Sequence, residues 1–252
     1  MCIRDRPIED CLEELILKEY KYYRNQVADL CSSDPLLQAI LSGVALGDRR
    51  TNSTFRRAQV SFKNGMECVE ELRDMGVLKI ESPMHHLTNQ SNSPDIAKRL
   101  IITTPFLRFW FAFVSPIFKG IRDGEYQEFF TNFKNKKGEF VHFVFEQLCH
   151  EFIKKQFSSE GIYSLGRYWD DRSQIELIAK TTTGKIIAGS CKYTNTKIKK
   201  SHLNYLFYEY EKIQLPVDVV VLFSKSGFSS ELKSLKEQNL KLYTTKSLKA
   251  LL

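Results

Sequence analysis

Residues that could act together on a phosphodiester bond occur in the second half of the chain. Ser190 and Lys192 are two positions apart in a largely apolar run, so on a β-strand their side chains would point to the same face. Glu176 lies in the preceding strand-like run, and a hairpin turn between the two runs would bring it opposite them. Glu146 lies in a helical stretch and could approach from the side. These residues predict one polar site on two neighbouring strands.

Two carboxylates and a lysine in this arrangement suit metal-assisted phosphodiester hydrolysis. Mg²⁺ prefers oxygen ligands, lowers the pKa of a bound water and neutralises charge that develops on the phosphate. Lys192 would orient the nucleophile or stabilise the pentavalent phosphate. We therefore take Glu146, Glu176 and Lys192 as candidate catalytic residues, and Glu176 as the candidate metal ligand. The alternative is a Glu176–Lys192 ion pair that has no further role.

The excess of positive charge lies in the same half of the chain. The formal net charge is +7, and residues 1–135 contain equal numbers of basic and acidic residues, so the excess falls in residues 136–252. A basic domain favours a polyanionic partner through phosphate contacts and counterion release. Five lysines near the predicted site are candidate nucleic-acid contacts: Lys154, Lys155, Lys197, Lys199 and Lys200. Tyr193 and Tyr205 among them could stack on bases, whereas a solvated lysine-rich surface is the alternative.

The second half of the chain predicts an α/β domain with helices on both faces of a mixed sheet. A helix is expected from 138 to about 157, with five inward residues: Phe140, Phe143, Val144, Leu148 and Phe152. Strands are expected over 174–179, 186–193, 217–223 and 240–243, with a turn at 182–185 and helices around 203–213 and 229–238. The run 217–223 is apolar and β-branched, as in strands that are covered on both faces.

Residues 34–104 predict a winged helix, with three helices and a two-stranded wing. Asp34-Pro35 offers an N-cap followed by proline, and later helices are expected over 54–62 and from Asn64 to Gly76, with Met75 inward. Strands are expected at 77–81 and 99–103. The outer positions of the third helix are mainly acidic, which opposes entry into a phosphate-lined groove. We therefore favour a structural or protein-contact role here. Four arginines keep DNA reading open as the alternative: Arg49, Arg50, Arg56 and Arg57.

The remaining segments complete a four-part organisation. Residues 1–33 form an N-terminal helical remnant, in which 1–6 look like a translated sequencing adaptor, so we expect the natural chain to extend further upstream. Residues 105–135 contain an aromatic helix interpreted as a buried bridge between two domains, and residues 136–252 form the α/β domain. No apolar run reaches the ~20 residues that span a membrane. The six cysteines lack C-x-x-C spacing, which indicates reduced thiols and a cytoplasmic protein.

Several segments, taken in order, resemble the C-terminal region of archaeal-type DEXX-box ATPases. They are 104–110 (TPFLRFW), 145–146 (FE), 166–169 (GRYW), 174–179 (QIELIA), 189–193 (GSCKY) and 222–228 (LFSKSGF). That family combines an N-terminal P-loop ATPase domain, a winged helix and a C-terminal domain similar to PD-(D/E)XK nucleases, and its function is poorly defined. The resemblance covers about residues 34–252. It implies a winged helix followed by a nuclease-like α/β domain.

The resemblance also assigns roles to single residues. The helix Glu of the family matches Glu146, the strand Asp of its E-I-D-h-h pattern falls on Glu176, and the Lys of its G-E-C-K-[WY] pattern matches Lys192. The Glu of that last pattern falls on Ser190, whose neutral hydroxyl is a weak Mg²⁺ ligand. Glu146 and Glu176 would then hold the ion almost alone. We therefore expect impaired hydrolysis and a surviving binding surface.

Together these features predict a nuclease-like DNA-binding module from the C-terminal part of a larger ATPase. If it is active, it is a Mg²⁺-dependent phosphodiesterase. No G-x-x-x-x-G-K-[ST] occurs, so we expect ATP to bind an ATPase domain of the same or a longer chain. One alternative is a non-catalytic region that docks on its ATPase domain through the helix at 105–114 and the acidic third helix. A third hypothesis, a winged-helix regulator or antitoxin, would need residues 34–104 alone to bind a specific DNA site.

Overall fold

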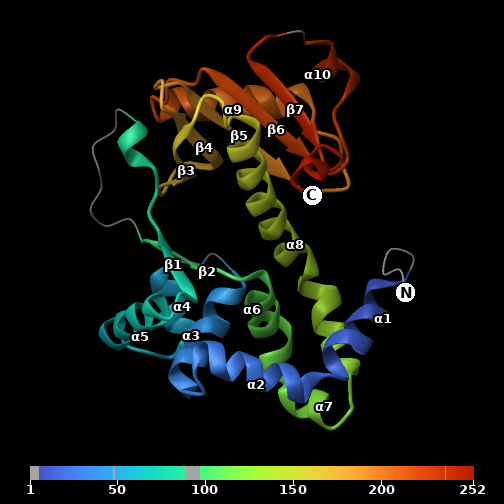
Figure 1. Cartoon of the computed structure of the whole chain (residues 1–252). Coiled ribbons are helices and arrows are strands. Elements are labelled where there is room, and N and C mark those ends of the chain that lie inside the picture. The colour runs from blue at the N-terminus through green and yellow to red at the C-terminus, as the bar shows by residue number, and fades with distance from the viewer. Residues whose placement is uncertain (1–5, 48, 89–96, 236) are drawn as a thin grey trace. The chain divides into compact units, whose positions relative to one another are not determined.

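The computed structural model describes residues 6–47, 49–88, 97–235 and 237–252. The chain divides into two compact units (Figure 1). Unit 1 consists of Met1–Glu81 and Ala97–Phe140, and unit 2 consists of Ser82–Ile96 and Val141–Leu252. The adaptor-like start of the chain, apart from Arg6, lies outside the described residues.

Unit 1 is mostly helical. Its helices are α1 (Ile8–Leu12), α2 (Tyr20–Cys31), α3 (Pro35–Ala45), α4 (Thr51–Ala58), α5 (Phe62–Asp74), α6 (Pro105–Phe109), α7 (Phe118–Arg122) and the first part of α8 (Gln127–Gln156). Two π-helical segments, η2 (Glu13–Leu17) and η4 (Trp110–Val114), and one 3-10 segment, η5 (Ser115–Ile117), lie between them. β1 (Leu78–Glu81) and β2 (Arg99–Ile102) pair antiparallel. The order of α3, α4, α5, β1 and β2 is the one predicted for residues 34–104.

Side-chain caps decide where two of these helices begin. Asp34 accepts hydrogen bonds from two backbone N–H groups of α3 at 2.7 and 3.2 Å, as predicted from its place before a proline. α5 begins at Phe62, because the hydroxyl of Ser61 accepts a hydrogen bond from the backbone N–H of Asn64 at 3.2 Å. The predicted start of this helix at Asn64 is therefore wrong. Met75, predicted to face inward, is 42% exposed.

The aromatic stretch 105–114 lies in the core of unit 1. All five residues of η4 are buried, and Trp110 stacks on Tyr20 with ring centroids 5.6 Å apart. Phe113 packs edge-on against Phe133 and Phe140 of α8, at centroid distances of 5.2 and 5.5 Å. The predicted burial is confirmed, but residues 105–135 all belong to unit 1, whereas the sequence predicted a bridge between two domains. Trp110 and Phe113 are not accessible to a partner, and docking through 105–114 stays a prediction.

Unit 2 contains a five-stranded mixed sheet. Its strands, in spatial order, are β3 (Ile162–Trp169), β4 (Gln174–Thr181), β5 (Ile186–Lys192), β6 (Val219–Ser224) and β7 (Leu240–Thr244). The β3–β4 and β4–β5 pairs are antiparallel, whereas β5–β6 and β6–β7 are parallel. The crossovers that the parallel pairs require contain α9 (Lys200–Lys212) and α10 (Ser230–Ser234). A 3-10 segment, η6 (Ser247–Leu251), follows β7.

Helices cover both faces of this sheet, as predicted (Figure 1). On one face, Cys149 and Ile153 of α8 pack against Leu177 and its neighbours. On the other, Leu203 of α9 and Leu232 of α10 belong to a second apolar cluster. All six residues of β6 are buried, in agreement with the apolar run in the sequence. No helix in the described part of the chain is both long and apolar enough to cross a membrane.

α8 is longer than predicted and is shared by the two units. It begins at Gln127 rather than at 138, and Phe129 and Phe133 near its start are buried in the core of unit 1. The division between the units falls within this helix, after Phe140. Leu148, predicted to face inward, is 42% exposed. Packing of Phe129 and Phe133 therefore extends the helix toward the N-terminus, past Gly138, where the sequence pattern changes.

β3 is a strand that the sequence pattern did not predict. It is an edge strand, and its register with β4 shifts twice along its length. Tyr163 is 74% exposed, and Gly166 lies in the middle of the strand. Bulges and exposed positions break the alternation of apolar and polar residues that identifies a strand from sequence. This strand carries Arg167, a residue of the candidate site.

Candidate functional site

Glu176 and Ser190 lie opposite each other on neighbouring antiparallel strands. The β4–β5 register pairs Leu177 with Gly189. One further step along this register brings Glu176 opposite Ser190, and Lys192 follows two residues later on the same face of β5. The Lys192 Nζ lies 2.7 Å from Glu176 Oε1. The predicted proximity of these two groups is confirmed, whereas their roles remain a prediction.

The Glu176 carboxylate is held by hydrogen bonds at both of its oxygens. Oε2 accepts one from the Ser190 hydroxyl at 2.9 Å and one from the Cys191 backbone N–H at 2.6 Å. Oε1 accepts one from the Lys192 ammonium. Because the Glu176 side chain is only 12% exposed, these donors take the place of most of its water. Ser190 thus contacts Glu176 at the position where the pattern that the sequence resembles has a second carboxylate.

Glu146, from α8, forms a buried ion pair with Arg167 of β3. Its Oε2 accepts a hydrogen bond from Arg167 Nε at 3.1 Å and lies 3.0 Å from Arg167 Nη2 in an ion-pair contact. The two side chains are 7% and 4% exposed. The guanidinium also lies over the Phe143 ring, 5.5 Å from its centroid. Arg167 had no predicted role, because the strand that carries it was not predicted.

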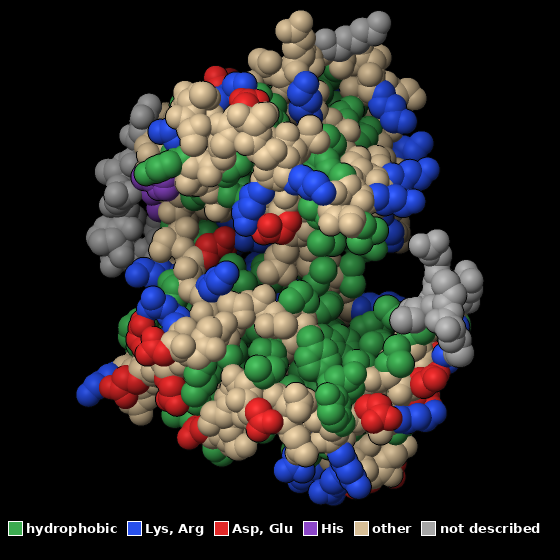
Figure 2. All heavy atoms as spheres, viewed as in Figure 1, with side chains coloured by type: hydrophobic (Ala, Val, Ile, Leu, Met, Phe, Trp, Pro, Cys, Tyr) green, Lys and Arg blue, Asp and Glu red, His purple; other side chains and the backbone are tan. Residues whose placement is uncertain are grey.

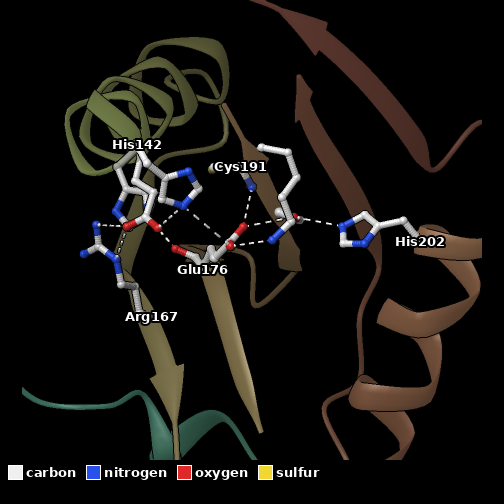
Figure 3. Close-up of polar contacts among 9 residues, drawn as sticks. His142, Arg167, Glu176, Cys191 and His202 are labelled. Atoms are coloured by element: carbon white, nitrogen blue, oxygen red, sulfur yellow. Dashed lines mark hydrogen bonds and ion pairs between the residues drawn. The ribbon is translucent and has the colours of Figure 1, made fainter. Parts of the chain in front are cut away.

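His142 is a further member of the site that sequence analysis missed. It lies one helical turn before Glu146 on α8, and Figure 3 shows its ring pointing toward Glu176. The Nε2 atom is 3.2 Å from Glu146 Oε1 and 4.0 Å from Glu176 Oε1. The hydrogen bond to Glu146 raises the pKa of His142, although burial opposes the shift. The spacing of four residues on a helix was the available signal, since it places both side chains on one face.

Two other histidines contact β4 and β5 from helices on opposite faces of the sheet. His202 of α9 lies with Nε2 3.0 Å from Ser190 Oγ, and since the Ser190 hydroxyl donates to Glu176, His202 is the donor in this contact (Figure 3). Burial, together with the nearby Lys192 charge, lowers the pKa of His202. His150 of α8 donates from Nε2 to the backbone carbonyl of Glu176 at 2.9 Å. Burial lowers the pKa of His150 to about 3, so it is neutral at ordinary pH.

The charges of the site balance, and solvent reaches only part of it. Two carboxylates are paired with two cations, Lys192 and Arg167. Lys192 and His142 are 33% and 34% exposed, whereas both carboxylates are largely buried. An incoming anion would therefore meet Lys192 and His142 first, with the carboxylates behind them. Such a surface can bind a phosphate and keep negative charge available for a cation or a proton.

A family model matches residues 110–215. It is DUF234, a family described as archaeal and bacterial proteins of unknown function. The match includes the site residues on α8, β3, β4, β5 and α9, and it covers less than half of the chain. No curated protein sequence matches the chain.

Three solved structures show a distant likeness. They are the protein of unknown function AF1548 (14% identity, TM-score 0.31, covering 39% of this chain and 58% of that one), a repair endonuclease from Pyrococcus abyssi (13%, 0.29, 39% and 45%) and VC1899 from Vibrio cholerae (14%, 0.33, 95% and 54%). This chain thus spans about half the length of each of them. TM-scores at this level assign neither a fold nor a function.

A divalent cation has one candidate set of ligands among the described residues: His142, Glu146 and Glu176. One atom of each lies within 4.8 Å of the others. The set contains both carboxylates that the sequence proposed for Mg²⁺, and it adds an imidazole nitrogen. Ser190 offers only a neutral hydroxyl, a weak Mg²⁺ ligand, which donates to Glu176. The oxygens suit Mg²⁺, whereas the nitrogen suits transition metals.

The five predicted lysines divide into two groups. Lys154 and Lys155 lie about 12 Å along α8 from Glu146, at 1.5 Å per residue, and are outside the site. Lys154 pairs with Glu151 at 2.8 Å, and Lys155 donates to the backbone carbonyl of Ala250. The other group follows Lys192 directly in the chain, between the end of β5 and the first turn of α9: Lys197, Lys199 and Lys200.

This second group belongs to a basic segment beside the site, which we define as residues 193–200. Lys197 and Lys199 are exposed, and Lys200 lies 3.9 Å from Glu231. Lys225, which had no role predicted from the sequence, joins the segment: its Nζ lies 4.7 Å from the centroid of the Tyr193 ring and donates to Asn195 at 2.8 Å. Figure 2 shows Lys and Arg side chains spread over the visible face of unit 2.

Proposed function

We propose that unit 2 is a nuclease-like module that binds nucleic acid, DNA in particular, with impaired hydrolysis. The observation that carries this proposal is the pair of Lys192 and Glu176, at 2.7 Å on adjacent strands, with the Glu146 carboxylate close to the same place. Lys192 is the more exposed partner, so its ammonium can receive a phosphate. The resemblance of this region to PD-(D/E)XK domains supports the same assignment.

The basic segment 193–200 supplies the contacts that binding requires. It begins immediately after the strand that carries Lys192, so a strand of nucleic acid bound along it would pass the site. When exposed lysines contact phosphates, cations condensed on the nucleic acid are released, which makes the binding affinity strongly dependent on salt. Tyr205, which is 52% exposed on α9, could stack on a base. The contacts are with backbone and base faces, so we expect little sequence preference.

Hydrolysis is expected to be weak because one acidic position of the site is neutral. Ser190 stands where the family pattern has Glu, and its hydroxyl donates to Glu176. If the Mg²⁺ implied by the resemblance binds, Glu146 and Glu176 would hold it, and it would activate water and neutralise charge. In the structure both carboxylates already have cationic partners, which weakens their pull on a second cation. We therefore expect this chain to bind nucleic acid but to hydrolyse it weakly.

Fluorescence anisotropy with labelled DNA tests the proposal on the full chain at a series of salt concentrations. The double variant Lys197→Gln/Lys199→Gln should weaken binding, and the slope of log affinity against log salt should fall by about one for each lysine that contacts a phosphate. The matched control is Lys246→Gln/Lys249→Gln, which removes two exposed lysines elsewhere in unit 2. Equal loss in both double variants, or binding that is independent of salt, would count against the proposed surface.

The same resemblance supports a wider setting for unit 2. We infer that α3, α4, α5, β1 and β2 form a winged helix and that the chain works in the cytoplasm with an ATPase domain, of its own or of a longer chain. ATP is expected to bind that domain, since no P-loop sequence occurs here. A fluorescent ATP analogue should therefore not bind the purified chain. Saturable binding of the analogue to the chain would contradict this inference.

A further inference from the structure

Three donor atoms converge at the site, and each carboxylate uses its oxygens in the same way. Glu146 is held at Oε2 by Arg167 and has Oε1 facing His142. Glu176 is held at Oε2 by Ser190 and Cys191, and it too has Oε1 on the side of His142. In both cases these groups hold one oxygen and the other lies toward the imidazole, and in Glu176 that second oxygen also accepts a hydrogen bond from Lys192. Metal-binding carboxylates are commonly held in this manner by neighbouring donors.

We propose that His142, Glu146 and Glu176 form a mixed nitrogen–oxygen site for a first-row transition-metal dication such as Mn²⁺, in preference to Mg²⁺. The imidazole of His142 supplies the ligand that Ser190 cannot. Mg²⁺ favours oxygen ligands only, whereas an imidazole together with carboxylates suits the transition metals. The use of this ion at a phosphodiester rests on the proposed function, but its binding does not.

The distances between the donor atoms agree with such an ion. Nε2 of His142 lies 3.2 Å from Glu146 Oε1 and 4.0 Å from Glu176 Oε1, and no pair of the three atoms exceeds 4.8 Å. Ligand bonds of about 2.1 Å place two neighbouring ligands of an octahedral ion about 3.0 Å apart. The His142–Glu146 separation is within about 0.2 Å of this value, whereas the His142–Glu176 separation exceeds it by about 1 Å. Small rotations of the side chains would complete the set, with water in the remaining positions.

Lys192 is the group that an incoming ion must displace. Its Nζ contacts Glu176 Oε1, the oxygen that the proposed site uses. The side chain is one third exposed and flexible, so it can turn into solvent when a dication takes its place. Once released, its ammonium is available to a phosphate at the same mouth of the site. Arg167 remains in place, because it holds the other oxygen of Glu146.

Titration of Mn²⁺ into the metal-free full chain, followed by the EPR signal of free Mn²⁺, tests this proposal without any nucleic acid. We expect saturable binding that Mg²⁺ displaces only in large excess. His142→Asn should weaken Mn²⁺ binding by at least about 10-fold, because loss of a group that only supports a metal ligand already costs about 10- to 100-fold. Mg²⁺ binding should change much less, so the Mn²⁺-to-Mg²⁺ ratio should fall. His86→Asn, at an exposed histidine of the same unit, is the matched control and should leave both affinities unchanged.

Two outcomes would overturn the proposal: displacement of Mn²⁺ by Mg²⁺ at equal concentration, or the same Mn²⁺-to-Mg²⁺ ratio in His142→Asn as in the parent chain. Should the variant unfold, pulsed EPR of Mn²⁺ on the parent chain decides, because a coordinated imidazole nitrogen modulates the signal and an all-oxygen site does not. The DNA-binding experiment is independent of this one. Loss of Mn²⁺ selectivity would leave lysine-dependent DNA binding intact, and loss of DNA binding would leave the metal site intact.

Discussion

His142 and Glu146 face each other one turn apart on α8, with Nε2 of the imidazole 3.2 Å from Oε1 of the carboxylate. The other oxygen of Glu146 forms an ion pair with Arg167 of the edge strand β3. One buried carboxylate therefore joins the helix to the outermost strand of the sheet. This link is expected to contribute to the stability of unit 2 as well as to its site.

Replacing Arg167 by Met should lower the free energy of unfolding by about 3–5 kcal/mol, because it leaves the buried Glu146 charge without its partner. Denaturant titration followed by circular dichroism measures the loss. The double variant Arg167→Met/Glu146→Gln carries no unpaired charge and should recover part of it. Arg172→Met, at an exposed position, should change stability by less than about 0.5 kcal/mol. If both arginine variants lose the same amount, the ion pair does not stabilise the fold.

Ser190→Glu should create or raise Mg²⁺-dependent cleavage of DNA if the proposed function holds, because it places a second carboxylate beside Glu176, as in the pattern that the sequence resembles. Ser190 is only 2% exposed, and a second carboxylate next to Glu176 repels it, so without metal the variant should melt below the parent chain. Added Mg²⁺ should reverse part of that loss. Ser190→Gln has the same size without the charge and is the control. Cleavage that is no higher in the Glu variant than in the Gln variant would argue against a nuclease-derived site.

Asp170 closes the turn between β3 and β4. Its Oδ1 accepts hydrogen bonds from the backbone N–H groups of Arg172 and Ser173, both at 2.6 Å, and its Oδ2 accepts one from the Tyr168 hydroxyl at 2.7 Å. Burial alone would raise the pKa of Asp170, but these hydrogen bonds outweigh it and lower that pKa below its ordinary value of 3.8. The ionised carboxylate is thus the form that the folded chain prefers.

A depressed pKa in the folded state gives stability that is present above the unfolded-state pKa and lost as the pH falls through the folded-state value. Asp170→Asn should therefore lower the free energy of unfolding at neutral pH, and the difference from the parent chain should shrink below about pH 4. Urea denaturation across the acid range measures this. Asp171→Asn, at an exposed neighbour, should have little effect throughout. A difference that is constant with pH would contradict the prediction.

Gly189 of β5 lies directly beside Val221 of β6. A Cβ at this position would be 1.8 Å from the backbone oxygen of Val221, which no side-chain rotation can relieve. Gly189→Ala should cost at least about 1–3 kcal/mol and weaken DNA binding, because the neighbouring residues of β5 include Ser190 and Lys192. Gly138→Ala, on an open face of α8, should instead stabilise by about 0.5–1 kcal/mol. Thermal unfolding compares the two, and effects of the same sign would refute the close approach.

The sequence by itself determined which side chains share a face along one element. Alternation along a strand placed Ser190 and Lys192 together, and a short hairpin brought Glu176 opposite them. The apolar run that became β6 and the N-cap of α3 were equally visible, because both depend on neighbouring residues. Local rules of this kind act over a few residues and need no knowledge of the rest of the fold.

Only the tertiary structure decided which side chains from different helices and strands come together. Arg167 reaches the site from a bulged edge strand whose pattern is too irregular to recognise, and α8 extends to Gln127 where aromatic residues bury in unit 1. His142 shares a helix face with Glu146, but its distance from Glu176 depends on how α8 packs across the sheet. That packing sums many weak apolar contacts between residues far apart in the chain, so no short stretch of sequence contains it.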